Sequence, residues 1–233
     1  CRARKSSLIM AKPELIVFDL DGTLIDSAPD LVEAVNFALS QLNKPTHSQA
    51  SIQQWIGNGA DVLVKRSLVG SWHVELEPVD FDAAFTLFKT YYAANDWVNS
   101  RLYDGVLDTL KQLKDMELKL ACVTNKTARF TNPLMETAGL APYFDFIASG
   151  DTFAAMKPSP IPLLETAKKI GVDPQKAWMI GDSINDISAG KQANFKTVAV
   201  SYGYAGQYTM SDLNATYTLN SLPELVALIQ NEI

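Results

Sequence analysis

Four acidic residues directly follow two apolar runs of the sequence, where they could act together in catalysis. Asp19 and Asp21 come after "LIVF" in the stretch "FDLDGTLID", and Asp182 and Asp186 come after "AWMI" in the stretch "GDSIND". Burying an ionised carboxylate without a partner is costly, so a site that gathers several acids must supply a cation, strong hydrogen-bond donors or both. The residues that follow the other apolar runs show what this chain offers.

Three further polar residues stand in corresponding places. Thr124 and Asn125 come after "LKLACV", and Lys157 opens "KPSP". Ligands of an open parallel sheet bind beyond the carboxyl ends of its strands, so we expect these residues and the four acids to share one crevice. The Thr124 hydroxyl, the Lys157 ammonium and the N–H groups that begin the next helix suit phosphate oxygens, and Asn125 is expected beside them. Acids beside a phosphate dianion require a hard divalent cation, and Mg²⁺ is the expected cofactor.

Together these groups predict phosphoryl transfer, a reaction that depends mainly on positioning and on stabilising charge. We expect the Asp19 carboxylate to attack phosphorus. Asp21, beside the turn at Gly22, is expected to protonate the departing alcohol and later to deprotonate the attacking water. Each motif alone is ordinary, since Asp and Gly are common turn residues. Their joint occurrence, each after an apolar run, favours the catalytic interpretation.

The apolar runs alternate with stretches of helical period, which is typical of an α/β fold with a parallel sheet and crossover helices. Such a fold would place the end of every strand at the same edge. Helices are expected between most of the strands. The predicted strands lie at residues 14–19, 117–123, 144–148, 177–181 and 196–200, with an edge strand at 216–219.

The chain between the first two predicted strands is too long for a simple crossover, because a structureless loop of that length is improbable in a compact domain. We expect residues 27–100 to form an inserted all-α cap domain on a core made of residues 10–26 and 101–233. A capping box of Ser27 and Asp30 is predicted to start the first cap helix. An aromatic stripe is expected to form the core of the cap: Phe81, Phe85, Phe88 and Tyr92.

Composition limits the partners and the compartment. The 233 residues are 47% apolar and carry a formal net charge of −6, which argues against a nucleic-acid-binding surface. The two cysteines, Cys1 and Cys122, cannot form a disulfide framework or a zinc cluster, so a cytoplasmic protein is expected. No apolar segment has the length of a membrane span. We expect a monomer or homodimer that acts on a small phosphate ester, with Met10 as its natural start and residues 1–9 as an upstream extension.

Four segments, "DLDGTLIDS", "VTN", "KPSP" and "GDSINDISAG", together resemble the four motifs of the haloacid dehalogenase superfamily. The resemblance is specifically to its Mg²⁺-dependent phosphatases with a helical cap, and it extends from about residue 14 to the end of the chain. It implies a Rossmann-like core and an aspartyl-phosphate intermediate at Asp19. It also implies acid–base catalysis by Asp21 and phosphate binding by Thr124 and Lys157.

The resemblance further implies how the metal is held. Mg²⁺ would bind to Asp19, the backbone carbonyl of Asp21 and Asp182, and Asp186 would be a second acid near the metal. The dehalogenases of the superfamily, which do not transfer phosphate, lack the acid that this chain has at position 21. A phosphatase is therefore expected.

Two other segments indicate which substrate the protein takes. "WIGNGADVLVKRSL" in the cap and "YGYAGQ" near the end most resemble bacterial phosphoglycolate phosphatases, which implies 2-phosphoglycolate as the substrate. The cap residues expected near its carboxylate are Gly57, Asn58, Lys65 and Arg66. A phosphosugar mutase of the β-phosphoglucomutase type, or a phosphatase of another small metabolite, would share the same core residues. A non-catalytic phosphate-binding module is disfavoured by the presence of Asp21 together with the metal acids.

Overall fold

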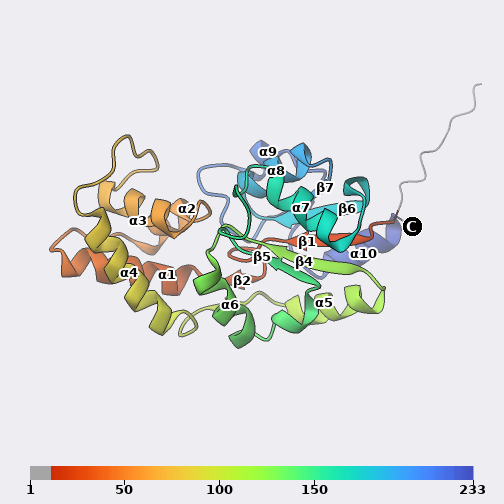
Figure 1. Cartoon of the computed structure of the whole chain (residues 1–233), viewed down its shortest axis with the longest axis horizontal. Coiled ribbons are helices and arrows are strands. Elements are labelled where there is room, and N and C mark those ends of the chain that lie inside the picture. The colour runs from red at the N-terminus through yellow and green to blue at the C-terminus, as the bar shows by residue number, and fades with distance from the viewer. Residues whose placement is uncertain (1–11, 233) are drawn as a thin grey trace, which may run out of the picture.

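A six-stranded, fully parallel sheet forms the centre of the computed structural model, which describes residues 12–232 (Figure 1). Its strand order is β5-β4-β1-β6-β7-β8, so β1 lies in the middle, between β4 and β6. All six predicted strands are confirmed, with ends within two residues of those expected. They are β1 (Leu15–Phe18), β4 (Lys119–Val123), β5 (Phe146–Ala148), β6 (Ala177–Gly181), β7 (Lys196–Val200) and β8 (Tyr217–Leu219).

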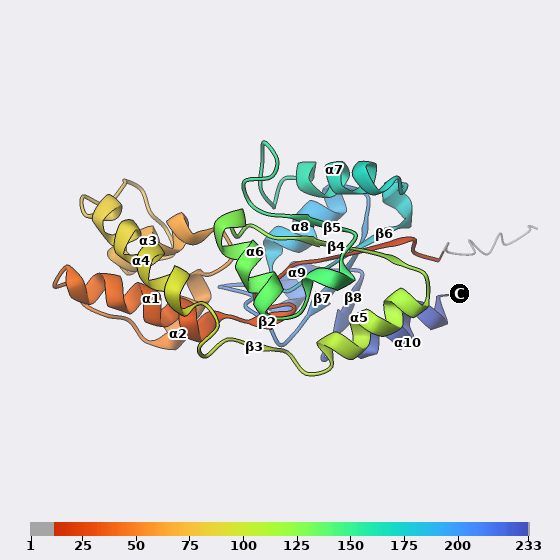
Figure 2. The ribbon, with the colours of Figure 1, turned by 60° about the horizontal axis from the view of Figure 1, so that its bottom comes forward.

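Helices cover both faces of the sheet, as the near-continuous apolar strands require. Alternate residues of β1 face opposite sides: Ile16 and Phe18 belong to the cluster with α5, α6 and α10, whereas Leu15 and Val17 belong to the cluster with α7 and α8. Figure 2 shows α7 and α8 above the sheet and α5 and α10 below it. The core helices are α5 (Val106–Asp115), α6 (Ala128–Thr137), α7 (Ile161–Ile170), α8 (Ile184–Gln192), α9 (Met210–Leu213) and α10 (Glu224–Asn231). The predicted α/β class is confirmed.

Four helices form a separate lobe at the left of Figure 1. They are α1 (Ala28–Gln41), α2 (Gln49–Trp55), α3 (Ala60–Val69) and α4 (Phe81–Asn95). Phe81, Phe88 and Tyr92 are buried in the apolar cluster of this lobe, so the packing role of the aromatic stripe is confirmed. A short antiparallel pair, β2 (Ile25–Asp26) and β3 (Arg101–Leu102), connects the lobe with the core. We propose that residues 27–100 are a cap domain and that this pair is its hinge.

The predicted capping box at the start of α1 is wrong. Ser27 occupies the N-cap position without a capping hydrogen bond, and its hydroxyl donates to Asp21 Oδ1 at 2.6 Å. The Asp30 carboxylate accepts from the backbone N–H groups of Asn99 and Ser100, both at 2.8 Å. Ser27 is therefore bound to the loop after β1 and Asp30 to the segment that precedes β3, and these partners replace the local cap.

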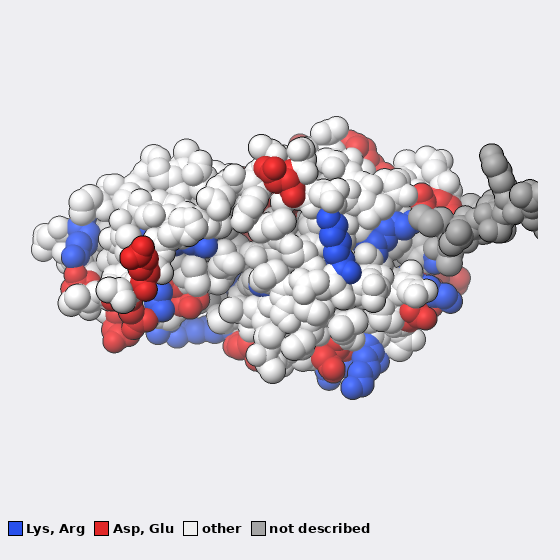
Figure 3. All heavy atoms as spheres, turned by 90° about the horizontal axis from the view of Figure 1, so that it is seen from above, with Lys and Arg blue, Asp and Glu red and all other residues white. Residues whose placement is uncertain are grey.

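The surface carries both signs of charge. On the face in Figure 3, Lys and Arg side chains are interspersed with Asp and Glu and leave broad uncharged areas. Within residues 12–232, none of the helices combines the length and the apolar character of a membrane span. The predictions for Met10 and for residues 1–9 lie outside the described residues.

Candidate active site

A cavity lies between the cap and the carboxyl ends of β1 and β4. The core contributes Asp19, Asp21 and residues 124–126. The cap and α6 contribute a mainly apolar wall of Leu31, Ile56, Gly57, Gly59, Ala60, Leu63, Phe88, Tyr92 and Phe130. The cavity has a volume of about 40 Å³, which is room for a few water molecules. Cap and core thus enclose a small space above the end of the central strand.

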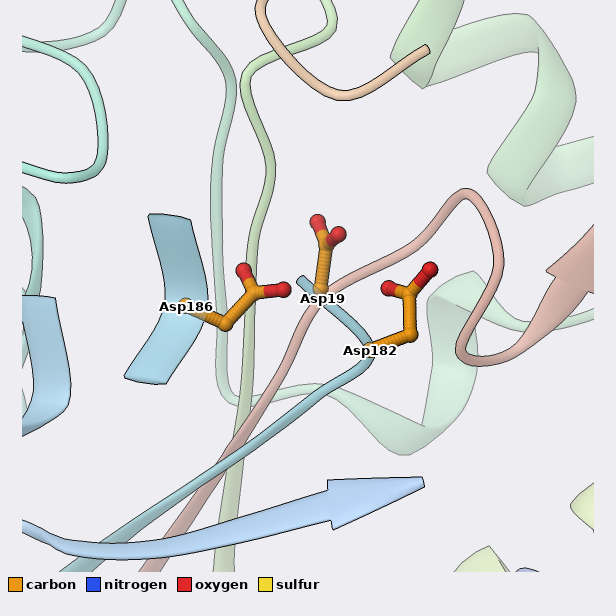
Figure 4. Close-up of side chains that lie close together, drawn as sticks. All are labelled: Asp19, Asp182 and Asp186. Carbon is orange, nitrogen blue, oxygen red and sulfur yellow. The ribbon is translucent and has the colours of Figure 1, made fainter. Parts of the chain in front are cut away.

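Three carboxylates meet at the floor of this region. Asp19 follows β1, Asp182 follows β6 and Asp186 lies in the first turn of α8, so sheet topology brings together residues more than 160 positions apart. One oxygen from each lies within 4.8 Å of the others. In Figure 4 the Asp19 side chain stands between those of Asp182 and Asp186. The structure therefore assembles three of the four acids predicted to hold a metal.

Gly22 lets the loop after β1 approach this cluster. Its φ of +86° is in the left-handed region that favours glycine, and a Cβ at this position would collide with the Asp182 carboxylate. Asp182 is held by the Thr23 hydroxyl, which donates to Oδ1 at 3.0 Å, and by the backbone N–H of Tyr204. The loop thus supplies both the space and a donor for the second acid.

Lys157 links two of the acids. Its ammonium lies 2.9 Å from Asp19 Oδ1 and 2.7 Å from Asp186 Oδ1, and only 3% of the residue is exposed. Burial alone would lower the pKa of Lys157, but the charges of Asp186 and Asp19 raise it above its usual range. The other oxygen of Asp186 accepts from the Ser183 N–H and hydroxyl. Lys157 is therefore a cation fixed between Asp19 and Asp186.

One lysine does not neutralise three acids. Burial, reinforced by the charge of Asp186, raises the pKa of Asp19 to about 7, even though Lys157 opposes the shift. Burial, with the charges of Asp186 and Asp19, also raises the pKa of Asp182 well above its usual range. A bound cation would relieve this repulsion, and a cluster of carboxylate oxygens is the donor set that hard divalent cations prefer. The residues present therefore fit a divalent metal.

Asp21 faces the cavity from the other side of the loop. Its Oδ1 accepts from Ser27, and its Oδ2 lies 3.2 Å from the ammonium of Lys126. The same ammonium donates to the Tyr92 hydroxyl at 2.9 Å. Burial raises the pKa of Tyr92 to about 12, although Lys126 opposes the shift, so this phenol stays neutral. Lys126 of the core and Ser27 of the hinge thus hold the Asp21 carboxylate, and Tyr92 of the cap holds Lys126.

A turn of the cap closes the cavity through its backbone. The Gly57 carbonyl accepts from the side-chain amides of Asn125 at 3.0 Å and Asn185 at 3.1 Å. Gly57 and Gly59 have φ values of +118° and +95°, which favour glycine at both places. The Asn125 amide also bonds to the backbone of Lys157, donating to its carbonyl and accepting from its N–H. Cap, second motif and third motif are thereby joined at one asparagine.

Comparison with known proteins identifies the family. Residues 16–200 match the model for haloacid dehalogenase-like hydrolases. The chain belongs to this family. It is 41% identical over 221 residues to a phosphoglycolate phosphatase of Nitrosococcus oceani, covering 95% of this chain and 98% of that protein. A phosphoglycolate phosphatase of Colwellia psychrerythraea is 44% identical over 197 residues, covering 84% and 87% of the two chains.

A solved structure has the same fold. It comes from Haemophilus somnus 129pt, is described as "a predicted phosphoglycolate phosphatase", and is 33% identical to this chain. It superposes with a TM-score of 0.87, and the match covers 94% of this chain and 99% of the other. The resemblance to the haloacid dehalogenase family that the four motifs indicated is confirmed.

The residues of the four motifs lie close together, but three predicted cap residues, Asn58, Lys65 and Arg66, do not line the cavity. Lys65 forms an ion pair with Glu77 at 2.8 Å and does not line the space above Asp19. Arg66 lies behind the turn, where its guanidinium donates to the Trp55 carbonyl at 2.9 Å and to Asn58 Oδ1 at 3.1 Å. The structure therefore does not bring Lys65 to the cavity, and Arg66 and Asn58 contact each other behind the turn.

Sequence reasoning missed three side chains of the site. Lys126 follows Thr124 and Asn125 directly, and its position after β4 was a usable signal. Tyr92 was assigned to packing alone, and no sequence pattern reveals its bond to a lysine 34 residues away. Tyr204 accepts from the backbone N–H of Ala28 and donates to Asp26, while its own N–H holds Asp182, so it ties the hinge to the acid cluster.

Proposed function

We propose that the protein is a Mg²⁺-dependent phosphatase that hydrolyses 2-phosphoglycolate to glycolate and phosphate through an aspartyl-phosphate intermediate. The observation that carries this proposal is the placement of Asp19 beside a fixed lysine and two further acids, with Asp21 across the same small cavity. Relatives named phosphoglycolate phosphatase, at 41% and 44% identity, support the substrate.

In the first step, an oxygen of Asp19 attacks phosphorus while the bond from phosphorus to the ester oxygen breaks. Asp21 gives its proton to the leaving oxygen, so the alcohol departs neutral at that atom. Lys157 offsets charge on the reacting group, and the Thr124 hydroxyl, which lines the cavity beside Asp19, is the expected donor to a phosphate oxygen. The products of this step are the free alcohol and an acyl phosphate on the Asp19 carboxylate.

In the second step, the oxygen of a water molecule attacks phosphorus while Asp21 takes a proton from that water. The bond between phosphorus and Asp19 breaks, which releases inorganic phosphate and restores both carboxyl groups. Asp19, Asp182 and the Asp21 carbonyl would hold Mg²⁺, with Asp186 close by. When bound, the metal neutralises the acids and the phosphate and thereby favours charge build-up on the transferring group.

The size of the cavity favours this ester over a phosphosugar. The volume of the cavity is about 40 Å³, whereas pockets for drug-sized ligands typically have volumes of about 300–1,000 Å³. A two-carbon leaving group suits the enclosed space better than a hexose. A mutase of the β-phosphoglucomutase type must also hold a sugar acceptor in place of water, and it remains the second candidate because the core residues do not distinguish it.

Phosphate release from a panel of esters tests the proposal. The panel contains 2-phosphoglycolate, other small phosphate esters and several hexose phosphates, each with Mg²⁺ and with chelator. We expect Mg²⁺-dependent release with the highest kcat/KM for 2-phosphoglycolate, and loss of release in Asp19→Asn. Preference for another ester would overturn the substrate, and conversion of a hexose phosphate to its isomer would favour the mutase.

A further inference from the structure

Lys126 is a buried cation to which the two steps above give no task. Only 8% of the residue is exposed, yet it lines the cavity. Its ammonium lies 3.2 Å from the Asp21 carboxylate and donates to the Tyr92 hydroxyl at 2.9 Å, so the positive charge is held at the cavity wall. Within residues 12–232 the polar side-chain atoms that this ammonium contacts are one carboxylate oxygen and one phenol oxygen. An ammonium has three hydrogens to donate, so one remains for a ligand.

We propose that Lys126 binds the carboxylate of the substrate and thereby determines specificity, an inference that rests on the proposed function. In 2-phosphoglycolate one methylene separates the ester oxygen from the carboxylate carbon. The group that binds the carboxylate must therefore lie close to the group that protonates the ester oxygen. Lys126 Nζ meets this requirement, since it lies 3.2 Å from Asp21 Oδ2.

The residues that line the cavity make the charge of Lys126 important for binding a carboxylate. Among the residues that line the cavity, Lys126 is the only cation, and Asp19 and Asp21 are both acids that repel a second carboxylate. The wall opposite them is formed largely by apolar side chains, including Leu31, Leu63 and Phe88. An ion pair formed away from water is stronger than one at the surface, and hydrogen bonds between charged partners are stronger than neutral ones.

The neighbouring basic residues are directed elsewhere. Lys65 is paired with Glu77 outside the cavity, and the Arg66 guanidinium is engaged by backbone carbonyls behind the turn. Lys157 contacts Asp19 and Asp186 below the phosphate position and does not line the cavity wall. Lys126 is therefore the cation placed for the far end of the substrate.

Ethyl phosphate provides the test, because it has a methyl group where 2-phosphoglycolate has its carboxylate. We compare kcat/KM for the two esters in wild-type protein, in Lys126→Met and in the matched control Lys65→Met. Wild type should prefer 2-phosphoglycolate. In Lys126→Met the ratio of the two kcat/KM values should fall by about 100-fold, the expected loss of one charge-assisted hydrogen bond. In Lys65→Met the ratio should stay within twofold, roughly the effect of losing an exposed ion pair.

Each other outcome overturns a defined statement. A wild-type protein that hydrolyses both esters equally well would overturn the proposed function and this inference with it. If wild type prefers 2-phosphoglycolate but Lys126→Met lowers both rates equally, Lys126 only positions Asp21 and the inference fails alone. Should Lys126→Met not fold, Tyr92→Phe serves as second variant. Loss of its hydroxyl frees the ammonium, so the ratio should change by several-fold, and an unchanged ratio would overturn the inference.

Discussion

The two halves of the cavity are built differently. On the core side, charged groups hold one another: Lys157 bridges Asp19 and Asp186, and Asp182 accepts from Thr23 and Tyr204. On the cap side, apolar side chains and the Gly57 carbonyl form the wall. We therefore expect the acid cluster with Lys157 to carry the chemistry, and Lys126 with the apolar wall to select the ester. A change in the acid cluster should alter the rate for every ester, whereas a change at Lys126 or in the apolar wall should alter the choice among them.

Removal of the attacking carboxylate should have the largest effect. Asp19→Asn keeps the size of the side chain but removes the nucleophile, so kcat should fall by at least about 10⁴-fold for all esters. Phosphate release with several esters measures this, and thermal unfolding shows that the variant is folded. A loss confined to one ester would contradict the assignment of Asp19 to the core chemistry.

Asp21→Asn should discriminate between leaving groups. The variant lacks the proton donor and acceptor, so hydrolysis of 2-phosphoglycolate should fall by about 10²–10⁴-fold. Acetyl phosphate leaves as acetate and needs no proton, so its first step should be slowed much less. Rapid-mixing kinetics with both compounds measure the first step separately from turnover. Equal slowing of the first step for both compounds would remove the proposed acid role of Asp21.

Metal binding should depend on pH in a defined direction. The pKa of Asp19 rises from 3.8 to about 7 on folding, and the pKa of Asp182 also rises. The metal-free fold is therefore stabilised by protons at low pH and should lose that contribution as the pH rises from about 4 to about 7. Because Mg²⁺ replaces those protons, it should raise Tm by more at pH 8 than at pH 5.

Thermal unfolding with Mg²⁺ and with chelator across this pH range tests the prediction. Asp19→Asn is the control, since it removes the share of the pH dependence that belongs to Asp19. An increase in Tm that is the same at pH 5 and pH 8 would show that metal and protons do not compete for these carboxylates.

The smallest of these effects is expected at the hinge. Tyr204→Phe removes the phenol oxygen that accepts from the buried Ala28 N–H and donates to Asp26, but it keeps the backbone N–H that holds Asp182. The free energy of unfolding should fall by about 1–3 kcal/mol, because a buried donor loses its partner. KM should rise by several-fold while the pH dependence of Mg²⁺ binding is retained. Denaturant unfolding and steady-state kinetics measure both. A changed pH dependence of metal binding would place Tyr204 with the core chemistry.

The same contrast explains what the sequence predicted. Asp19, Thr124 and Asp182 each follow a strand, and parallel strands end at one edge, so their convergence could be predicted from strand order alone. The direction of a long side chain near the cavity depends instead on the partners that distant segments of the chain offer it. Lys65 and Lys126 look alike in the sequence, but one pairs with Glu77 outside the cavity and the other lies between Asp21 and Tyr92.

Local patterns failed for a related reason. The spacing of Ser27 and Asp30 suits a capping box, but Asp21 and the backbone of Asn99 and Ser100 offer partners that the local sequence does not show. Hydrogen bonds of this kind span up to 70 residues in the sequence. The bonds to Asp30 join the first and the last segment of the cap, and they become visible only when both chain segments are placed.

The most direct test of Asp19 as the nucleophile is to trap phosphate on its carboxylate. Asp21→Asn is mixed with acetyl phosphate and Mg²⁺ and quenched in acid, and its peptides are examined by mass spectrometry, with Asp19→Asn as the control. We predict a phosphorylated peptide containing Asp19 in Asp21→Asn and none in the control. Phosphate on another residue, or an equal signal in the control, would contradict the claim that the core carboxylate is the nucleophile.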